Sequence, residues 1–341
     1  MSHDEIAVAP PASLVVSEGA DQDGLTPAAA VRVADGWAAN TRRAFAHDWR
    51  NFADWCAVAG RRSLPATGAT LANYVVHLIE TAMPAPATLE RAIGTVQAHH
   101  RAVDLSVNAT PARLALRSYR REWAAEGGRV RQAAALTVEQ LRTMLEVTGD
   151  GLAGLRDRTL LLIGFTMMAR RSELACIDIG DVRIVDDGLE VFLPTSKTDK
   201  DSVGTTVRVP YGTLAQTCAV RTTHAWLTAL AEHGLTDGPL LRGVDRPCRL
   251  AGTPGATGRG TGRMSGAGIN LVVKRLAEAA GLEGVSAHSL RAGSATAAAM
   301  AGVPRAQIAF QGRWEPKSTA VDAYIRPADA WRDNPMRKVG L

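Results

Sequence analysis

The spacing of hydrophobic residues divides the chain into three regions. Residues 1–36 are rich in Ala, Pro, Asp and Ser and have no lasting period, which predicts a disordered tail. From Trp37 onward, aromatic residues recur close to one face of a helix, and further helices are predicted near 67–81, 86–103 and 109–125. Prolines punctuate these helices, as proline does at helix starts. Residues 37–126 are therefore predicted to form an all-helical domain.

A second domain is predicted over residues 136–341, after a polar, glycine-containing linker at 127–135. Thr137 and Gln140 have the spacing of a capping box, so a helix is expected to begin there. Alternating residues at 189–193 and 205–209 predict a β-hairpin with a long polar loop. The glycine-rich stretch 252–268 is predicted to be a mobile loop. Further helices are expected at 154–168, 171–178, 213–233, 265–281, 288–301, 304–311 and 316–324, which makes the chain mostly α with a small β-sheet.

Composition and charge narrow the class of protein. No run of 18 apolar residues is present, so a membrane span is not expected, and the four cysteines lack pair spacing, which suits a reducing cytoplasm. The net charge is +5, but the first 36 residues hold six acids and one base, so the remainder carries +10. Such a basic body suggests a polyanionic partner, although an ordinary basic surface gives the same count. The arginines singled out as DNA contacts are Arg42, Arg43, Arg50, Arg259 and Arg263.

Several common catalytic signatures are absent from the sequence. There is no G-x-x-x-x-G-K-[ST] segment, no H-E-x-x-H and no G-x-S-x-G. An ATPase, a zinc protease and an α/β-hydrolase therefore have no support.

Four separated clusters of reactive residues remain. Arg170 and Glu173 stand three apart and share a helix face, and Lys197 lies in the predicted hairpin turn. His288 and Arg291 fall in the first turn of a helix that Ser286 can cap, which makes a ready anion site. The fourth cluster comprises Gly312-Arg313-Trp314 and then Tyr324. Taken singly, each cluster also has an ordinary structural interpretation. In the same order, these are a surface ion pair, a turn lysine, a histidine at a helix start with a surface arginine, and core aromatics.

The order of these clusters resembles the tyrosine recombinase (phage integrase) family, and its Cre-like site-specific recombinases in particular. The resemblance runs from about residue 37 to the end of the chain. It implies a helical domain and a mixed α+β catalytic domain that together clamp DNA like a C. It implies seven site residues: Arg170 with its companion Glu173, the turn lysine Lys197, the pair His288 and Arg291, Trp314 where many relatives have His, and the nucleophile Tyr324. Arg171 and Lys200 are neighbouring rivals to Arg170 and Lys197.

The resemblance also implies a reaction and partners. DNA would be cut and rejoined through a 3′-phosphotyrosine and a Holliday junction, without ATP, metal or another cofactor. The expected partner is double-stranded DNA with inverted-repeat sites, bound by a homotetramer that is monomeric when free, in the cytoplasm with the nucleoid. A C-terminal tail anchored by Trp331 would link the protomers. The alternatives are a type IB topoisomerase, a catalytically silent DNA-binding protein, and an integrase with a reduced N-terminus.

Overall fold

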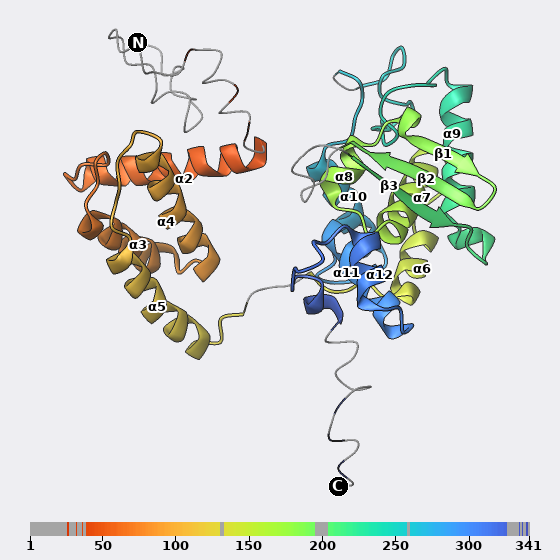
Figure 1. The fold of residues 1–341 in the computed structure, drawn as a ribbon. Helices are drawn as coiled ribbons and strands as arrows, with labels where there is room; N and C mark the ends of the chain where they lie inside the picture. The colour runs from red at the N-terminus through yellow and green to blue at the C-terminus, as the bar shows by residue number, and fades with distance from the viewer. Residues whose placement is uncertain are drawn as a thin grey trace. The chain divides into compact units, whose positions relative to one another are not determined.

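The computed structural model describes residues 39–129, 133–194, 204–257 and 260–325, together with single positions at Thr26, Arg32, Gly36, Asn334, Met336 and Val339. The chain divides into two compact units, Met1–Arg131 and Gln132–Leu341 (Figure 1). The predicted tail at 1–36 lies almost wholly outside the described residues.

The regular secondary structure described in the first unit is all helical. Its helices are α2 (Ala39–Val58), α3 (Gly68–Ala82), α4 (Pro86–Arg101) and α5 (Thr110–Ala125). The Thr67 side chain caps α3 by accepting the Thr70 N–H at 3.1 Å, and α4 and α5 each carry a proline in their first turn, where the missing N–H costs nothing. These bounds agree with the predicted helices to within two residues.

Aromatic rings from α2 fill the core of this unit. Phe52 is fully buried and meets Tyr74 of α3 edge-on, with ring centroids 5.1 Å apart. Trp49 stacks on the buried His99 of α4 at 4.1 Å. The aromatic periodicity noted in the sequence is thus the inward face of α2.

The second unit combines helices with one small sheet. Its elements are α6 (Val138–Glu146), α7 (Gly151–Thr166), α8 (Arg171–Cys176), η1 (Ile179–Asp181), β1 (Val182–Val185), β2 (Gly188–Leu193), β3 (Thr205–Pro210), η2 (Ala215–Thr217), α9 (Ala219–Glu232), α10 (Gly266–Ala279), α11 (Ala287–Met300) and α12 (Arg305–Gly312). The strands form an antiparallel sheet in the order β1-β2-β3. The mostly helical fold with a small sheet confirms the predicted fold class.

The sheet buries one face and exposes the other, as the alternating sequence predicts. Leu189, Val191 and Leu193 of β2 join the main core of this unit, while Phe192 points away from it. On the open face, Glu190 accepts hydrogen bonds from Arg183 and Arg208, which stand opposite it on the two neighbouring strands.

Three local predictions need correction. Strand β1 was not expected, and the helix predicted over 213–233 is broken into η2 and α9. The helix predicted over 316–324 is also wrong in its first part, since only 322–325 are helical. The carbonyls of Pro316 and Ser318 accept hydrogen bonds from the Arg305 side chain, and this tertiary contact holds the stretch in turns instead.

Helix α11 packs unusually close to the start of the second unit. A Cβ on Gly293 would meet the Leu136 carbonyl oxygen at 2.0 Å, and the Leu136 N–H donates to the Ser289 carbonyl at 3.3 Å. Only glycine allows this approach, which fixes the height of the first turn of α11. None of the helices in the described ranges is long and apolar enough to cross a membrane.

The predicted capping box at α6 is present. The Thr137 side chain accepts the Gln140 N–H at 3.2 Å, and the Gln140 side chain accepts the Thr137 N–H at 3.0 Å.

Thr137→Ala should lower the free energy of unfolding of the second unit by about 1 kcal/mol, because the Gln140 N–H at the helix start loses its acceptor, the Thr137 hydroxyl. Urea unfolding followed by circular dichroism measures this loss. Thr143→Ala, one helical turn and a half further along α6, is the control, because its hydroxyl lies on the exposed face. An equal loss in both variants would show that the cap contributes nothing.

Candidate active site

Three segments of the second unit bring six of the predicted residues together. Arg170 and Glu173 lie at the start of α8, His288 and Arg291 lie in the first turn of α11, and Trp314 and Tyr324 follow α12. These segments are far apart in sequence, so the contacts below depend on the packing of α7, α8, α11 and α12.

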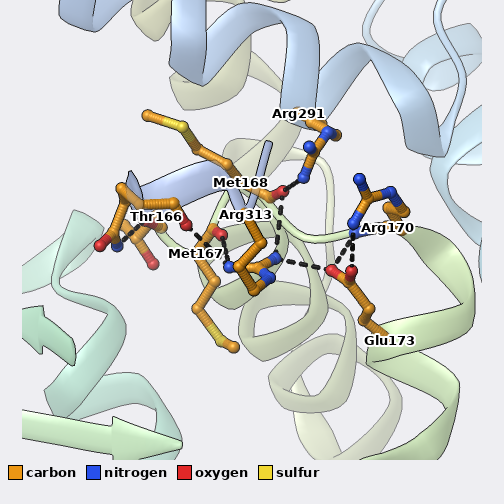
Figure 2. A network of polar contacts seen from close by, with 8 residues as sticks. Thr166, Met167, Met168, Arg170, Glu173, Arg291 and Arg313 are labelled. Carbon is orange, nitrogen blue, oxygen red and sulfur yellow. Dashed lines mark hydrogen bonds and ion pairs between the residues drawn. The ribbon is translucent and has the colours of Figure 1, made fainter. Parts of the chain in front are cut away.

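A buried carboxylate stands at the centre of the site (Figure 2). Glu173 is only 3% exposed, and its oxygens accept hydrogen bonds from the Arg170 backbone N–H at 2.9 Å and from Arg170 Nη1 at 2.6 Å. Arg313 Nη2 donates a third bond at 2.6 Å. Burial by itself raises the pKa of Glu173, but Arg313 and Arg170 outweigh it and hold that pKa below its ordinary value. Glu173 is therefore a buried anion shared by two arginines.

Arg313 ties the segment after α12 to the turn between α7 and α8. Besides Glu173, its guanidinium donates to the carbonyls of Met167 at 3.0 Å and Gln311 at 2.8 Å. Its backbone has φ 56°, the left-handed conformation, and it ends α12. Arg313 belongs to the Gly312-Arg313-Trp314 cluster of the sequence, but the sequence alone indicates no role for it. The one feature of the sequence that could have indicated a role for Arg313 is its position next to Trp314, a predicted site residue.

Arg291 is buried to 1% exposure and points at the same turn (Figure 2). Its Nη1 donates to the Met168 carbonyl at 2.5 Å, while Nη2 has no hydrogen-bond partner among the described residues. Burial and the nearby Arg170 charge lower the pKa of Arg291 to about 9, so it stays protonated at neutral pH. A buried cation with an unused donor is suited to hold an anion.

The Trp314 ring covers one face of Arg291. The guanidinium carbon lies 3.7 Å from the ring centroid, a cation–π contact. The ring also folds back over Gly312, where a Cβ would lie 1.8 Å from the indole. Trp314 also contacts Tyr324, with ring centroids 5.7 Å apart. Glycine at 312 is therefore required by the packed indole.

His288 and Tyr324 face each other at the open side of the site. His288 Nε2 lies 2.8 Å from the Tyr324 hydroxyl. Burial lowers the pKa of His288, and the charges of Arg291 and Arg170 lower it further, so the imidazole is neutral at pH 7. The Tyr324 carbonyl accepts from Thr296 Oγ1 of α11 at 3.2 Å, which holds the tyrosine segment against that helix.

The other predicted residues either lie elsewhere in the second unit or the first unit, or lie outside the described residues. Lys197, its rival Lys200, and Arg259 lie outside the described residues. Arg171 is exposed and turns away from Glu173 toward Gly266 of α10.

Of the arginines singled out as DNA contacts, Arg263 pairs with Asp178 and donates to the Ala175 carbonyl at 2.9 Å. Arg43 and Arg50 are exposed on α2, and Arg42 is half-buried there. Within the described ranges, no group of three His, Cys, Asp or Glu residues is arranged to bind a metal.

Comparison with known proteins gives the family of the chain. The model of the phage integrase family matches residues 134–330. An integrase/recombinase XerD homolog from Selenomonas ruminantium is 31% identical over 88% of this chain and 85% of its own. The Cre recombinase of Escherichia phage P1 is 25% identical over 85% of this chain and 87% of its own.

The fold is shared with a solved structure of low identity. A crystal structure of the XerH site-specific recombinase, bound to palindromic difH substrate after cleavage, superposes with a TM-score of 0.56 at 15% identity and covers 91% of this chain and 82% of that one. The chain belongs to the phage integrase family, the tyrosine-type site-specific DNA recombinases.

Gly312→Ala should destabilise the second unit by about 2 kcal/mol, because the new methyl group forces the indole off Arg291. Gly94→Ala is the matched control. Gly94 lies inside α4 with open space around its Cα, so alanine there should stabilise by about 1 kcal/mol. Thermal unfolding of both variants measures the two shifts, and a Gly312→Ala melting temperature at or above wild type would contradict the packing described.

Proposed function

We propose that this protein cuts and rejoins DNA at specific sites with Tyr324 as nucleophile, through a 3′-phosphotyrosine and a Holliday junction. The observation that carries the proposal is the Tyr324 hydroxyl, 2.8 Å from His288 Nε2, beside the Arg291–Trp314 stack. A tyrosine hydroxyl has an ordinary pKa of about 10, so it needs a partner that takes its proton during attack. A neutral His288 is that partner.

The charge that builds on the phosphate is held by Arg170 and Arg291. Attack by Tyr324 Oη forms the bond to phosphorus, and the bond from phosphorus to the 5′ oxygen breaks. The two non-bridging oxygens gain negative charge meanwhile, and forked guanidinium donors stabilise it. Arg291 Nη2, buried and without a protein partner in the described ranges, is the donor aimed at one oxygen. Glu173 orients Arg170 and takes no direct part.

The leaving 5′ oxygen needs a proton, and Lys197 is assigned as its donor. Lysine suits this role because its ammonium reaches far from the backbone on a flexible stem. The assignment rests on its place between β2 and β3, strands that are paired up to Leu193 and Thr205. The phosphotyrosine conserves the bond energy, so rejoining by the free 5′ hydroxyl reverses these steps without ATP.

The partner in this proposal is double-stranded DNA with inverted-repeat sites. In this proposal, the helical domain at 37–126 and the catalytic domain at 136–341 are joined by the linker at 127–135 and bind the duplex as a C-shaped clamp. Arg42, Arg43, Arg50, Arg259 and Arg263 contact phosphates. The protein is monomeric when free, and four protomers assemble on two duplexes through the tail that contains Trp331. Recovery of bound duplexes from a random pool tests this, because a tetramer of this kind selects an inverted repeat.

Tyr324→Phe should keep DNA binding and abolish the covalent adduct, because only the nucleophilic oxygen is lost. The substrate is the duplex selected above, nicked beside the cut position so that the covalent product is trapped. Adduct formation is read on a denaturing gel and binding on a native gel. Phe310→Tyr, which exchanges the same two residue types at an exposed ring of α12, is the control for a phenylalanine–tyrosine exchange outside the site. A persisting adduct in Tyr324→Phe would falsify the nucleophile.

Lys197→Ala should slow cleavage on the order of 10²-fold or more while binding changes little, because it removes the proton donor. A substrate with a 5′-thio leaving group needs little protonation and should restore the rate. Lys200→Ala, three residues away in the same loop, is the matched control. If Lys200→Ala is slow and rescued by the thio substrate while Lys197→Ala is normal, the proton donor is Lys200.

A further inference from the structure

Arg313 is a buried arginine that the proposed chemistry does not use. Its side chain is 7% exposed and sits between Glu173 and the carbonyls of Met167 and Gln311 (Figure 2). A charged group this deeply buried is costly unless its partners repay desolvation, and here an anion and backbone acceptors do so.

Arg313 has a backbone conformation that is unusual for an arginine. At φ 56° a residue with a Cβ is strained, and glycine is the residue that usually ends a helix in this conformation. Helix α3 ends the same way at Met83, with φ 40°, but Met83 is 64% exposed and its side chain is not held in the interior. Arg313 therefore combines a strained backbone with a buried charge, and both are unfavourable, which indicates that its side chain has a specific role.

The charges around Glu173 indicate that use. The cations that face it are Arg170 from the start of α8, Arg313 from the end of α12, and Arg291 from α11. Arg170 and Arg313 bind its two oxygens, while Arg291 is bonded to Met168 and keeps Nη2 unused. Without Arg313, Glu173 Oε2 would keep only the hydrogen bond from the Arg170 backbone N–H. It would then draw Arg291 toward itself or take up a proton.

We propose that Arg313 is a positioning residue: by binding Glu173 it keeps that carboxylate charged and saturated, so that Glu173 holds Arg170 and Arg291 Nη2 stays available for the scissile phosphate. Arg313 also fixes Trp314 against Arg291, since the two residues are adjacent. The role of Arg313 toward the phosphate rests on the proposed function. Its ion pair with Glu173 does not, so the two can be tested apart.

The first test uses the full-length protein without DNA and compares Arg313→Gln with wild type at pH 7.5 and pH 4.5. In wild type the lowered pKa of Glu173 gives stability that is present above its ordinary value of 4.5 and is lost as the pH falls. In the variant, burial, which raises the pKa of Glu173, is opposed only by Arg170, so that pKa rises relative to wild type. The variant should therefore melt about 6 °C or more below wild type at pH 7.5 and much closer to it at pH 4.5.

A double variant separates the ion pair from simple loss of packing. Glu173→Gln combined with Arg313→Gln removes both charges and keeps two amides of similar size. It should melt above either single variant at pH 7.5 and lose the extra pH dependence. Equal destabilisation by Arg313→Gln at both pH values, or strict additivity of the two changes, would overturn the proposed pair.

The glycine variants give the matched control for the backbone. Met83→Gly relieves a strained helix end and removes an exposed side chain, so it should melt at or slightly above wild type. Arg313→Gly relieves the same kind of strain but removes the cation from Glu173, so it should melt below wild type. If Arg313→Gly is as stable as Met83→Gly, the arginine is dispensable and the inference is wrong.

The second test measures cleavage of the nicked duplex in a single turnover. Arg313→Gln should cleave on the order of 10²-fold more slowly than wild type with binding within about twofold, and Arg313→Lys should recover part of the rate, because its ammonium restores charge beside Glu173. If wild type forms no adduct, the proposed function fails and the DNA-free results stand. If wild type cleaves and Arg313→Gln cleaves equally fast, the positioning role fails and the proposed function stands.

Discussion

A single buried carboxylate sets the geometry of the candidate site. Glu173 binds the backbone and side chain of Arg170 on its own helix and the side chain of Arg313 after α12. Two stretches of chain that are 140 residues apart are joined at this point. Breaking such a buried pair from one side leaves an uncompensated charge, so Glu173 has a strong influence on where the side chains of Arg170 and Arg313 lie.

The second constraint is the close approach of α11. Gly293 lets this helix rest on the backbone at Leu136, so its first turn presents His288 and Arg291 at a fixed height. Met168, which is in the left-handed conformation at φ 49°, turns its carbonyl toward Arg291. The close packing at Gly293 and the turn at Met168 thus hold Arg291 in place, as the ion pair with Glu173 holds Arg170.

Much of this arrangement follows from sequence, and the exceptions have physical causes. The long helices and the β2–β3 hairpin carry clear periodicity. Spacing marks Arg170 with Glu173 and His288 with Arg291 as pairs, whereas the role of Tyr324 is implied by the resemblance to the tyrosine recombinase family. Strand β1 is four residues long, too short for a pattern to stand out.

The turn at 316–321 depends on Arg305, a tertiary contact that periodicity does not contain. Arg313 escaped notice because its partner Glu173 is distant in sequence. Lys197 lies outside the described residues and stays a prediction.

The lopsided surroundings of Arg291 have a stereochemical consequence. Trp314 covers one face of its guanidinium and the Met168 carbonyl takes one amino group, which leaves Nη2 on a single edge. The two non-bridging oxygens of a phosphodiester are prochiral, and a pocket of this kind distinguishes them. The site is therefore handed with respect to phosphorus. In the proposed reaction, sulfur in place of one oxygen would lie against Arg291 in one diastereomer and away from it in the other, so the two sulfur-substituted substrates would differ in their contacts with the site.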